Sequence, residues 1–218
     1  MKLIGFEEGL FPELDNYNAG FNKGSRRLKV TIDTLAAKTH YIENYPELLF
    51  NTLDLLPNIR NHRCSHGENE HAGRDYDMSH IFSPIKIVGD VIDTVHLFEH
   101  VALEIQCQVA EMQECSGLTC NYWEPETRYD VFIEYEEAPI AEFSCLTSLK
   151  LINSQINTPE EPFNIRDVLM LATTIARQGV EDAGSLSSHL GWSNGKLNRI
   201  IAELQELKFP FSAHLPAA

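Results

Sequence analysis

The clearest pattern of apolar and polar positions lies between residues 93 and 114. Apolar residues recur there at alternating spacings of three and four, which keeps their side chains on one face of an α-helix. These residues are Val95, Phe98, Ala102, Ile105, Val109 and Met112. The sequence therefore predicts a long helix with one buried face.

Weaker patterns predict further elements on both sides of this helix. Residues 29–33 and 128–135 are rich in β-branched and aromatic residues and are predicted to be strands. Residues 46–57 and 141–152 carry apolar residues at helical spacing and are predicted helices. The polar stretch 58–83 contains four of the nine histidines and predicts a long loop, a kind of segment that is often functional.

The composition changes after residue 152. Residues 153–162 have the Asn, Ser, Thr, Pro and Glu content of a linker. Three amphipathic segments follow, and a Gly-containing turn between the last two is typical of a helix-turn-helix unit; the segments are 166–177, 183–190 and 194–207. We therefore predict an α+β fold, with a mixed or antiparallel sheet packed with helices in residues 1–157 and a small all-α domain, helix-turn-helix-like or winged-helix-like, in residues 158–218.

Composition and charge narrow the class of protein. The chain has 17 Lys and Arg against 32 Asp and Glu, a net charge of −15, which argues against nucleic acids and anionic membranes as partners. No secretory signal is visible, and no apolar run reaches the roughly 18 residues of a membrane span. Five cysteines are an odd number and do not suggest a disulfide framework. We expect a cytoplasmic protein with reduced thiols.

The predicted long helix carries an H-x-x-E-H motif, His96-Leu-Phe-Glu99-His100. Residues four apart lie one turn apart on the same helical face, so both imidazoles can bind one zinc ion. In such a site Glu99 is the general base that takes a proton from the activated water. The competing interpretation is a pair of histidines on a solvated helix face.

A catalytic zinc requires a third protein ligand and leaves its fourth position for water. Candidates follow downstream, at Glu134, Glu136 and Glu137 on or after the predicted strand and at Glu142 in the next predicted helix. We favour Glu142, because a carboxylate in the first turn of a helix packed beside the motif helix is held rigidly.

Two further clusters have simpler interpretations. The segment His62-Arg-Cys64-Ser-His66 contains metal-ligating residue types, but no second half with zinc-site spacing follows, so a polar loop is expected. The basic residues Lys23, Arg26, Arg27 and Lys29 could meet a carboxylate or a phosphate, but a solvated surface is expected.

The order of these motifs resembles the amino-terminal domain of cyanophycin synthetase over residues 45–152. The similar segments are LLP at 55–57, HRCSHG at 62–67, HLFEHVALEIQ at 96–106 and YDVFIEYEE at 129–137. EHVALEIQ is the most specific of them. The chain departs from the family after Gly67, where Glu-Asn-Glu-His71-Ala-Gly-Arg replaces the usual Gly-Gly-Phe segment.

Cyanophycin synthetases join this domain to an ATP-grasp ligase and a Mur-ligase-like module, and they build a polymer with an aspartate backbone and arginine branches. These 218 residues contain neither module and no Walker-type glycine loop, so ATP-dependent synthesis is not expected of them. The resemblance implies that the domain holds the polymer, and that in metallopeptidase-like members it cuts the polymer. It also makes His62, Cys64 and His66 candidates for substrate contact, since their loop is expected to border the site.

We therefore predict a zinc-dependent hydrolase of an amide bond in a peptide or a cyanophycin-like polymer. One alternative is a module that binds the polymer or another ligand without turnover. The other is a regulatory protein that acts through its helix-turn-helix-like tail, where Asn194, Lys196, Asn198 and Arg199 would face DNA. Residues 159–218 contain five Lys and Arg against seven Asp and Glu, which disfavours DNA as a partner; association with a second copy of the chain stays open.

Overall fold

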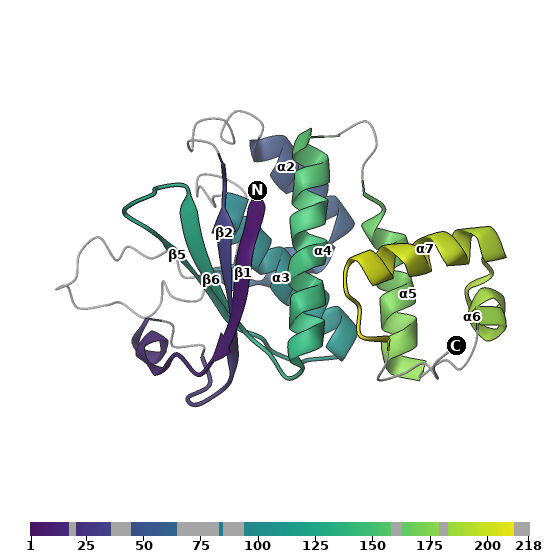
Figure 1. The fold of residues 1–218 in the computed structure, drawn as a ribbon, viewed down its shortest axis with the longest axis horizontal. Helices are drawn as coiled ribbons and strands as arrows, with labels where there is room; N and C mark the ends of the chain where they lie inside the picture. The colour runs from purple at the N-terminus through teal and green to yellow at the C-terminus, as the bar shows by residue number, and fades with distance from the viewer. Residues whose placement is uncertain are drawn as a thin grey trace.

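The computed structural model describes residues 1–17, 21–35, 45–64, 83–84, 94–157, 163–178 and 183–211. A four-stranded sheet lies on one side, two long helices cover one of its faces, and three further helices lie beyond them (Figure 1). This is the α+β arrangement that the sequence predicts.

The sheet is antiparallel throughout, in the order β1-β2-β6-β5. Its strands are β1 (Lys2–Gly9), β2 (Arg27–Asp33), β5 (Gly117–Asn121) and β6 (Arg128–Glu134). Alternate residues of β2, namely Leu28, Val30 and Ile32, are fully buried on the face that the helices cover. A separate two-stranded ladder pairs β3 (Arg63–Cys64) with β4 (Ser83–Pro84).

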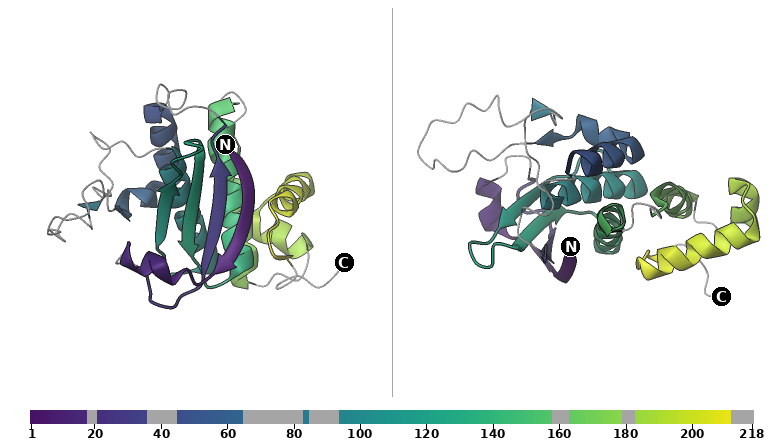
Figure 2. Two further views of the ribbon diagram at one scale, coloured as in Figure 1. Left: turned by 60° about the vertical axis from the view of Figure 1, so that its left-hand side comes forward. Right: turned by 90° about the horizontal axis from the view of Figure 1, so that it is seen from above.

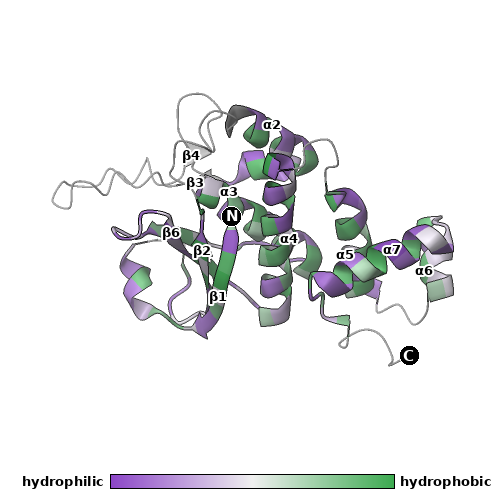
Figure 3. Ribbon diagram, turned by 45° about the horizontal axis from the view of Figure 1, so that its top comes forward, coloured by the Kyte–Doolittle hydropathy of each residue, from purple (hydrophilic) through white to green (hydrophobic). Residues whose placement is uncertain are grey.

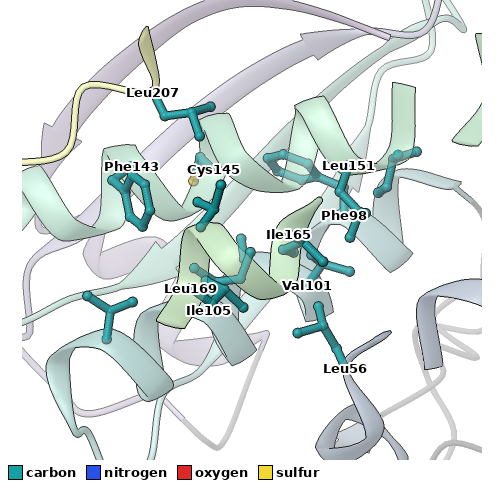
Figure 4. Close-up of a cluster of buried hydrophobic side chains, with 14 of the residues drawn as sticks. Leu56, Phe98, Val101, Ile105, Phe143, Cys145, Leu151, Ile165, Leu169 and Leu207 are labelled. Atoms are coloured by element: carbon teal, nitrogen blue, oxygen red, sulfur yellow. The ribbon is translucent and has the colours of Figure 1, made fainter. Parts of the chain in front are cut away.

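Helices α3 (Thr94–Ala110) and α4 (Ala138–Asn157) pack against each other and cover this face, and α2 (Tyr45–Leu55) packs against α4. Their apolar residues join those of the sheet in one hydrophobic cluster. Figure 4 shows Phe98, Val101 and Ile105 of α3 close to Phe143, Cys145 and Leu151 of α4. The stripe that the sequence predicts on the long helix is thus a central part of the core.

The opposite face of the sheet is partly covered by a short 3-10 helix, η1 (Pro12–Asn16). Leu14, Phe21 and Phe132 form a small second cluster there. Arg27 begins β2 and is fully buried, where it pairs with Asp15 and donates to the carbonyls of Leu10 and Phe11. The prediction of a solvated basic surface is therefore wrong for Arg27, whose charge is neutralised inside the fold.

The C-terminal helices are α5 (Ile165–Gln178), α6 (Ala183–Leu190) and α7 (Asn194–Glu206). Seen from above, they lie beside α4 on the side away from the sheet (Figure 2). Hydrophilic and hydrophobic residues alternate along α4 and α7, as expected for amphipathic helices (Figure 3). The apolar sides of α5, α6 and α7 belong to the same hydrophobic cluster as the sheet and α3. The division at residue 157 stays a prediction.

Several parts of the chain differ from the sequence-based prediction, among them the predicted loop 58–83, which contains β3 and the start of β4. The strands β1 and β5, at the two edges of the sheet, were not predicted. The predicted linker begins five residues too early, because α4 continues through Asn157. Within this extension, the side-chain amide of Asn153 accepts from the amino group of Met1 and donates to the Met1 carbonyl. None of the helices in the described ranges has the length and apolar character needed to span a membrane.

Candidate functional site on helix α3

Four polar side chains follow one another at every fourth residue of α3: His96, His100, Glu104 and Gln108. This spacing puts successive members about 6 Å apart along one side of the helix. His100 and Glu104 are buried, although they are polar. Burial of polar groups is costly unless they are hydrogen-bonded, so their partners define the site.

His96 and His100 are close together at the first turns of α3. Their Nε2 atoms are 3.2 Å apart, and their rings are stacked with centroids 4.8 Å apart. Two nitrogens bound tetrahedrally to one zinc at about 2.0–2.1 Å would be separated by about 3.3–3.4 Å. The spacing of this pair therefore fits two ligands of one zinc ion, and imidazole nitrogen is a donor that zinc favours.

Glu99 lies on the neighbouring side of α3 and faces β5. Its side chain is buried, and its Oε2 accepts a hydrogen bond from Thr119 Oγ1. Gly117 of the same strand leaves room for it, because a Cβ atom there would stand 2.7 Å from Glu99 Oε1. The edge strand β5 thus fixes the position of the carboxylate next to the histidine pair.

His62 approaches the other side of His100 from outside the helix. Its Nδ1 lies 3.1 Å from His100 Nδ1, and its Nε2 lies 3.0 Å from Glu104 Oε2. The 3-10 helix η2 (Pro57–Asn61) holds it there, since fully buried Ile59 anchors η2 in the core and the Ile59 carbonyl accepts from the backbone N–H of His62. A residue of the predicted loop is thereby part of the α3 site.

The carboxylate of Glu104 accepts from three donors. Oε1 accepts from Asn58 Nδ2 at 3.1 Å and from Gln108 Nε2, while Oε2 faces His62. Burial by itself raises the pKa of Glu104, but the hydrogen bonds from His62, Gln108 and Asn58 outweigh it and hold the pKa below its ordinary value. The buried carboxyl group is therefore ionised at neutral pH.

Comparison with known families gives this arrangement a context. The sequence profile of the cyanophycin synthase-like N-terminal domain matches residues 27–157, more than half of the chain. The chain belongs to this family. None of the curated proteins compared with the chain matches it. The matched region of this cyanophycin synthase-like domain contains the whole sheet except β1, together with α2, α3 and α4.

Three further residues of the cyanophycin synthase-like domain were predicted to belong to the site, namely Glu142, Cys64 and His66. Glu142 is in the second turn of α4, where burial and the charge of Glu142 together raise the pKa of the Cys145 thiol. In the described ranges, no three or more His, Cys, Asp or Glu side chains are grouped so that they could hold a metal ion. Glu142 as the third ligand stays a prediction. His66 and the side chain of Cys64 lie outside the described part of the structure.

Several residues of the site were not predicted from the sequence. Glu104 and Gln108 continue the four-residue spacing of His96 and His100, and this spacing was the available indication. Asn58, Thr119 and Gly117 come from other elements, and no sequence pattern marks them. The ring nitrogens of His62 face His100 and Glu104, and its predicted contact with substrate stays a prediction.

Proposed function

We propose that the cyanophycin synthase-like domain is a zinc-dependent hydrolase of amide bonds in a cyanophycin-like polymer or a related peptide. The observation that carries the proposal is the 3.2 Å separation of the Nε2 atoms of His96 and His100, in a motif whose Glu99 is also buried. Family membership supports the polymer as substrate class. The net charge of −15 favours a substrate that carries arginine side chains.

His96 and His100 supply two nitrogen ligands, and Glu142 is the sequence-based candidate for the third. When bound, zinc supplies a Lewis acid that acidifies the attacking water and polarises the scissile carbonyl group. Glu99 takes a proton from the water as it adds to the carbonyl carbon, and returns the proton to the leaving nitrogen as the C–N bond breaks. Thr119 and Gly117 keep the Glu99 carboxylate in position for both transfers.

Metal content is the first test, with protein prepared without chelators or a metal-binding affinity tag. We expect about one zinc per chain in the wild type and its loss in His96→Ala. His189→Ala is the matched control, because His189 is exposed on α6 and far along the chain from the motif. Wild-type protein that takes up no zinc, even after zinc is added and the excess removed, would overturn the proposal.

Turnover separates a hydrolase from a module that only binds the polymer. The probe is purified cyanophycin, and the products are followed by mass spectrometry. We expect Glu99→Gln to keep zinc and polymer binding while hydrolysis falls by about 10²–10⁴-fold. The control is Glu126→Gln, at an exposed position in the turn between β5 and β6. Polymer binding with no cleavage by the zinc-loaded wild type would favour the binding module.

A further inference from the structure

The side chains of Glu104, His62, His100 and His96 form one chain of contacts in which each pair is separated by 3.0–3.2 Å. Because an imidazole nitrogen either donates or accepts, a fixed acceptor at one end determines the role of every nitrogen along the chain. Glu104 provides that fixed end.

Glu104 can only accept. The side-chain amide nitrogens of Asn58 and Gln108 are donors without acceptor capacity, and both point at Oε1. Hydrogen bonds from these donors and from His62 hold the pKa of the carboxyl group below its ordinary value in spite of burial, so Glu104 is ionised and presents Oε2 as an acceptor to His62 Nε2. It follows that His62 Nε2 carries a proton and donates a hydrogen bond to Glu104 Oε2.

The same reasoning continues to His100. At a pH above the ordinary pKa of histidine both rings are taken as neutral, so His62 with its proton on Nε2 has a lone pair on Nδ1, which faces His100 Nδ1 at 3.1 Å. His100 must then carry its proton on Nδ1 and donate it to His62. The Nε2 atom of His100 is left with its lone pair, and this atom faces His96 Nε2.

We infer that Glu104, acting through His62, is a positioning residue that locks His100 in the tautomer whose Nε2 can bind a metal ion. The inference rests on the proposed function for the role of His100 as a ligand, whereas the tautomer itself follows from the hydrogen-bond geometry with Glu104 ionised and both imidazoles neutral. Carboxylates and other acceptors placed behind a ligating histidine fix its ring and raise metal affinity in the same way.

Glu104→Gln is the most informative variant. It keeps the shape of the side chain but replaces the acceptor that faces His62 with a donor. The amide oxygen of the new side chain is needed by the Asn58 and Gln108 donors, so its NH₂ group faces His62 Nε2. His62 then accepts at Nε2 and donates from Nδ1, and His100 accepts at Nδ1 and carries its proton on Nε2. The variant should therefore switch both tautomers and block the nitrogen that faces His96.

The tautomers are read directly by long-range ¹H–¹⁵N NMR of the metal-free protein at about pH 8.5, two units above the ordinary pKa of histidine. We expect wild-type His62 in the Nε2–H form and His100 in the Nδ1–H form. The wild-type spectrum needs no variant to fold. An Nε2–H form of His100, or a His62 ring protonated on both nitrogens, would overturn the inference.

Zinc affinity gives the second readout, measured by competition with a chromophoric chelator. We expect Glu104→Gln to weaken zinc binding by about 10–100-fold. Gln108→Ala is the matched control, because it removes a different hydrogen bond to the same carboxylate and leaves the His62 contact in place. An equal loss of zinc affinity in both variants would overturn the inference that Glu104 acts on His100 through His62.

The two proposals fail in different ways. If the wild type shows the expected tautomers but binds no zinc, the proposed hydrolase fails and so does the positioning role of Glu104 toward a metal, while the tautomer assignment survives. If zinc binds at His96 and His100 but the tautomers are reversed in the metal-free protein, the proposed hydrolase function stands and the positioning role of Glu104 is wrong.

Discussion

Helices α3 and α7 both carry polar residues that suggest chemistry, but the fold treats them differently. On α3, Glu99, His100 and Glu104 are buried, and groups from other elements contact them: Thr119 contacts Glu99, and His62 contacts His100 and Glu104. On α7, Asn194, Asn198 and Arg199 are exposed.

The stability of the fold therefore depends on the polar residues of α3 more than on those of α7. A buried polar group destabilises the fold unless its partners are placed accurately, so the buried polar residues of α3 depend on their hydrogen-bond partners. An exposed polar residue on α7 costs little to keep or to lose. We therefore look for chemistry on α3, and the contrast predicts opposite responses to matched substitutions.

The largest expected effect on folding is at Glu104. Glu104→Ala leaves the donors on His62, Asn58 and Gln108 without their acceptor in a buried environment. We expect the free energy of unfolding, measured by urea denaturation, to fall by about 3 kcal/mol. The matched change on α7, Arg199→Ala, should alter it by less than about 0.5 kcal/mol. Similar losses in the two variants would remove the distinction between the helices.

Two glycine substitutions compare the packing around Glu99 of α3 with the open surface of α7. In Gly117→Ala the new methyl group would meet the Glu99 side chain at 2.7–3.0 Å, so the carboxylate must move and stability should fall by about 1–3 kcal/mol. In Gly195→Ala on α7 the methyl group meets nothing within 4 Å, and stability should rise by up to about 1 kcal/mol. Thermal unfolding of both variants checks the signs. A stabilised Gly117→Ala would show that Glu99 is not tightly held.

The pH dependence of stability should report the carboxylate of Glu104. Its pKa in the folded protein is below the ordinary value of 4.5, so the folded state binds the proton more weakly than the unfolded state. The stabilisation is fully present above about pH 4.5 and is lost as the pH falls through the folded-state pKa. The difference in unfolding free energy between wild type and Glu104→Gln should therefore be constant near neutral pH and shrink in acid. A difference that grows below pH 4.5 would contradict the ionised state.

The smallest expected effect is on DNA binding by the C-terminal helices. Lys196, one of the residues predicted to face DNA, pairs with Asp167 at 2.8 Å and lies over the Trp192 ring. Together with the acidic balance of this region, these contacts leave little positive charge for phosphates. We expect no shift of a mixed-sequence duplex in a low-salt gel assay. A shift that weakens with added salt would instead support the regulatory alternative.

The local sequence predicted the elements that have strong periodicity. The long helix was expected at residues 93–114 and extends over Thr94–Ala110, and the last helix was expected at 194–207 and extends over Asn194–Glu206. Periodicity is a local property of the chain, so it is readable without the fold. The edge strand β1 was not predicted, because its residues are exposed or only half-buried and Glu7 and Glu8 stand next to each other, which leaves little alternation of polar and apolar residues.

The local sequence was enough to place His96, Glu99 and His100 together on one helix, because residues three and four apart on a helix share a side. The surroundings of these residues depend on tertiary contacts. Glu104 was readable as a helical neighbour, but its pairing with His62 joins residues 42 positions apart, and the contact of Glu99 with Thr119 crosses from α3 to the sheet. Such contacts depend on how η2 and β5 pack on α3, and packing of distant segments leaves no periodic mark in the chain.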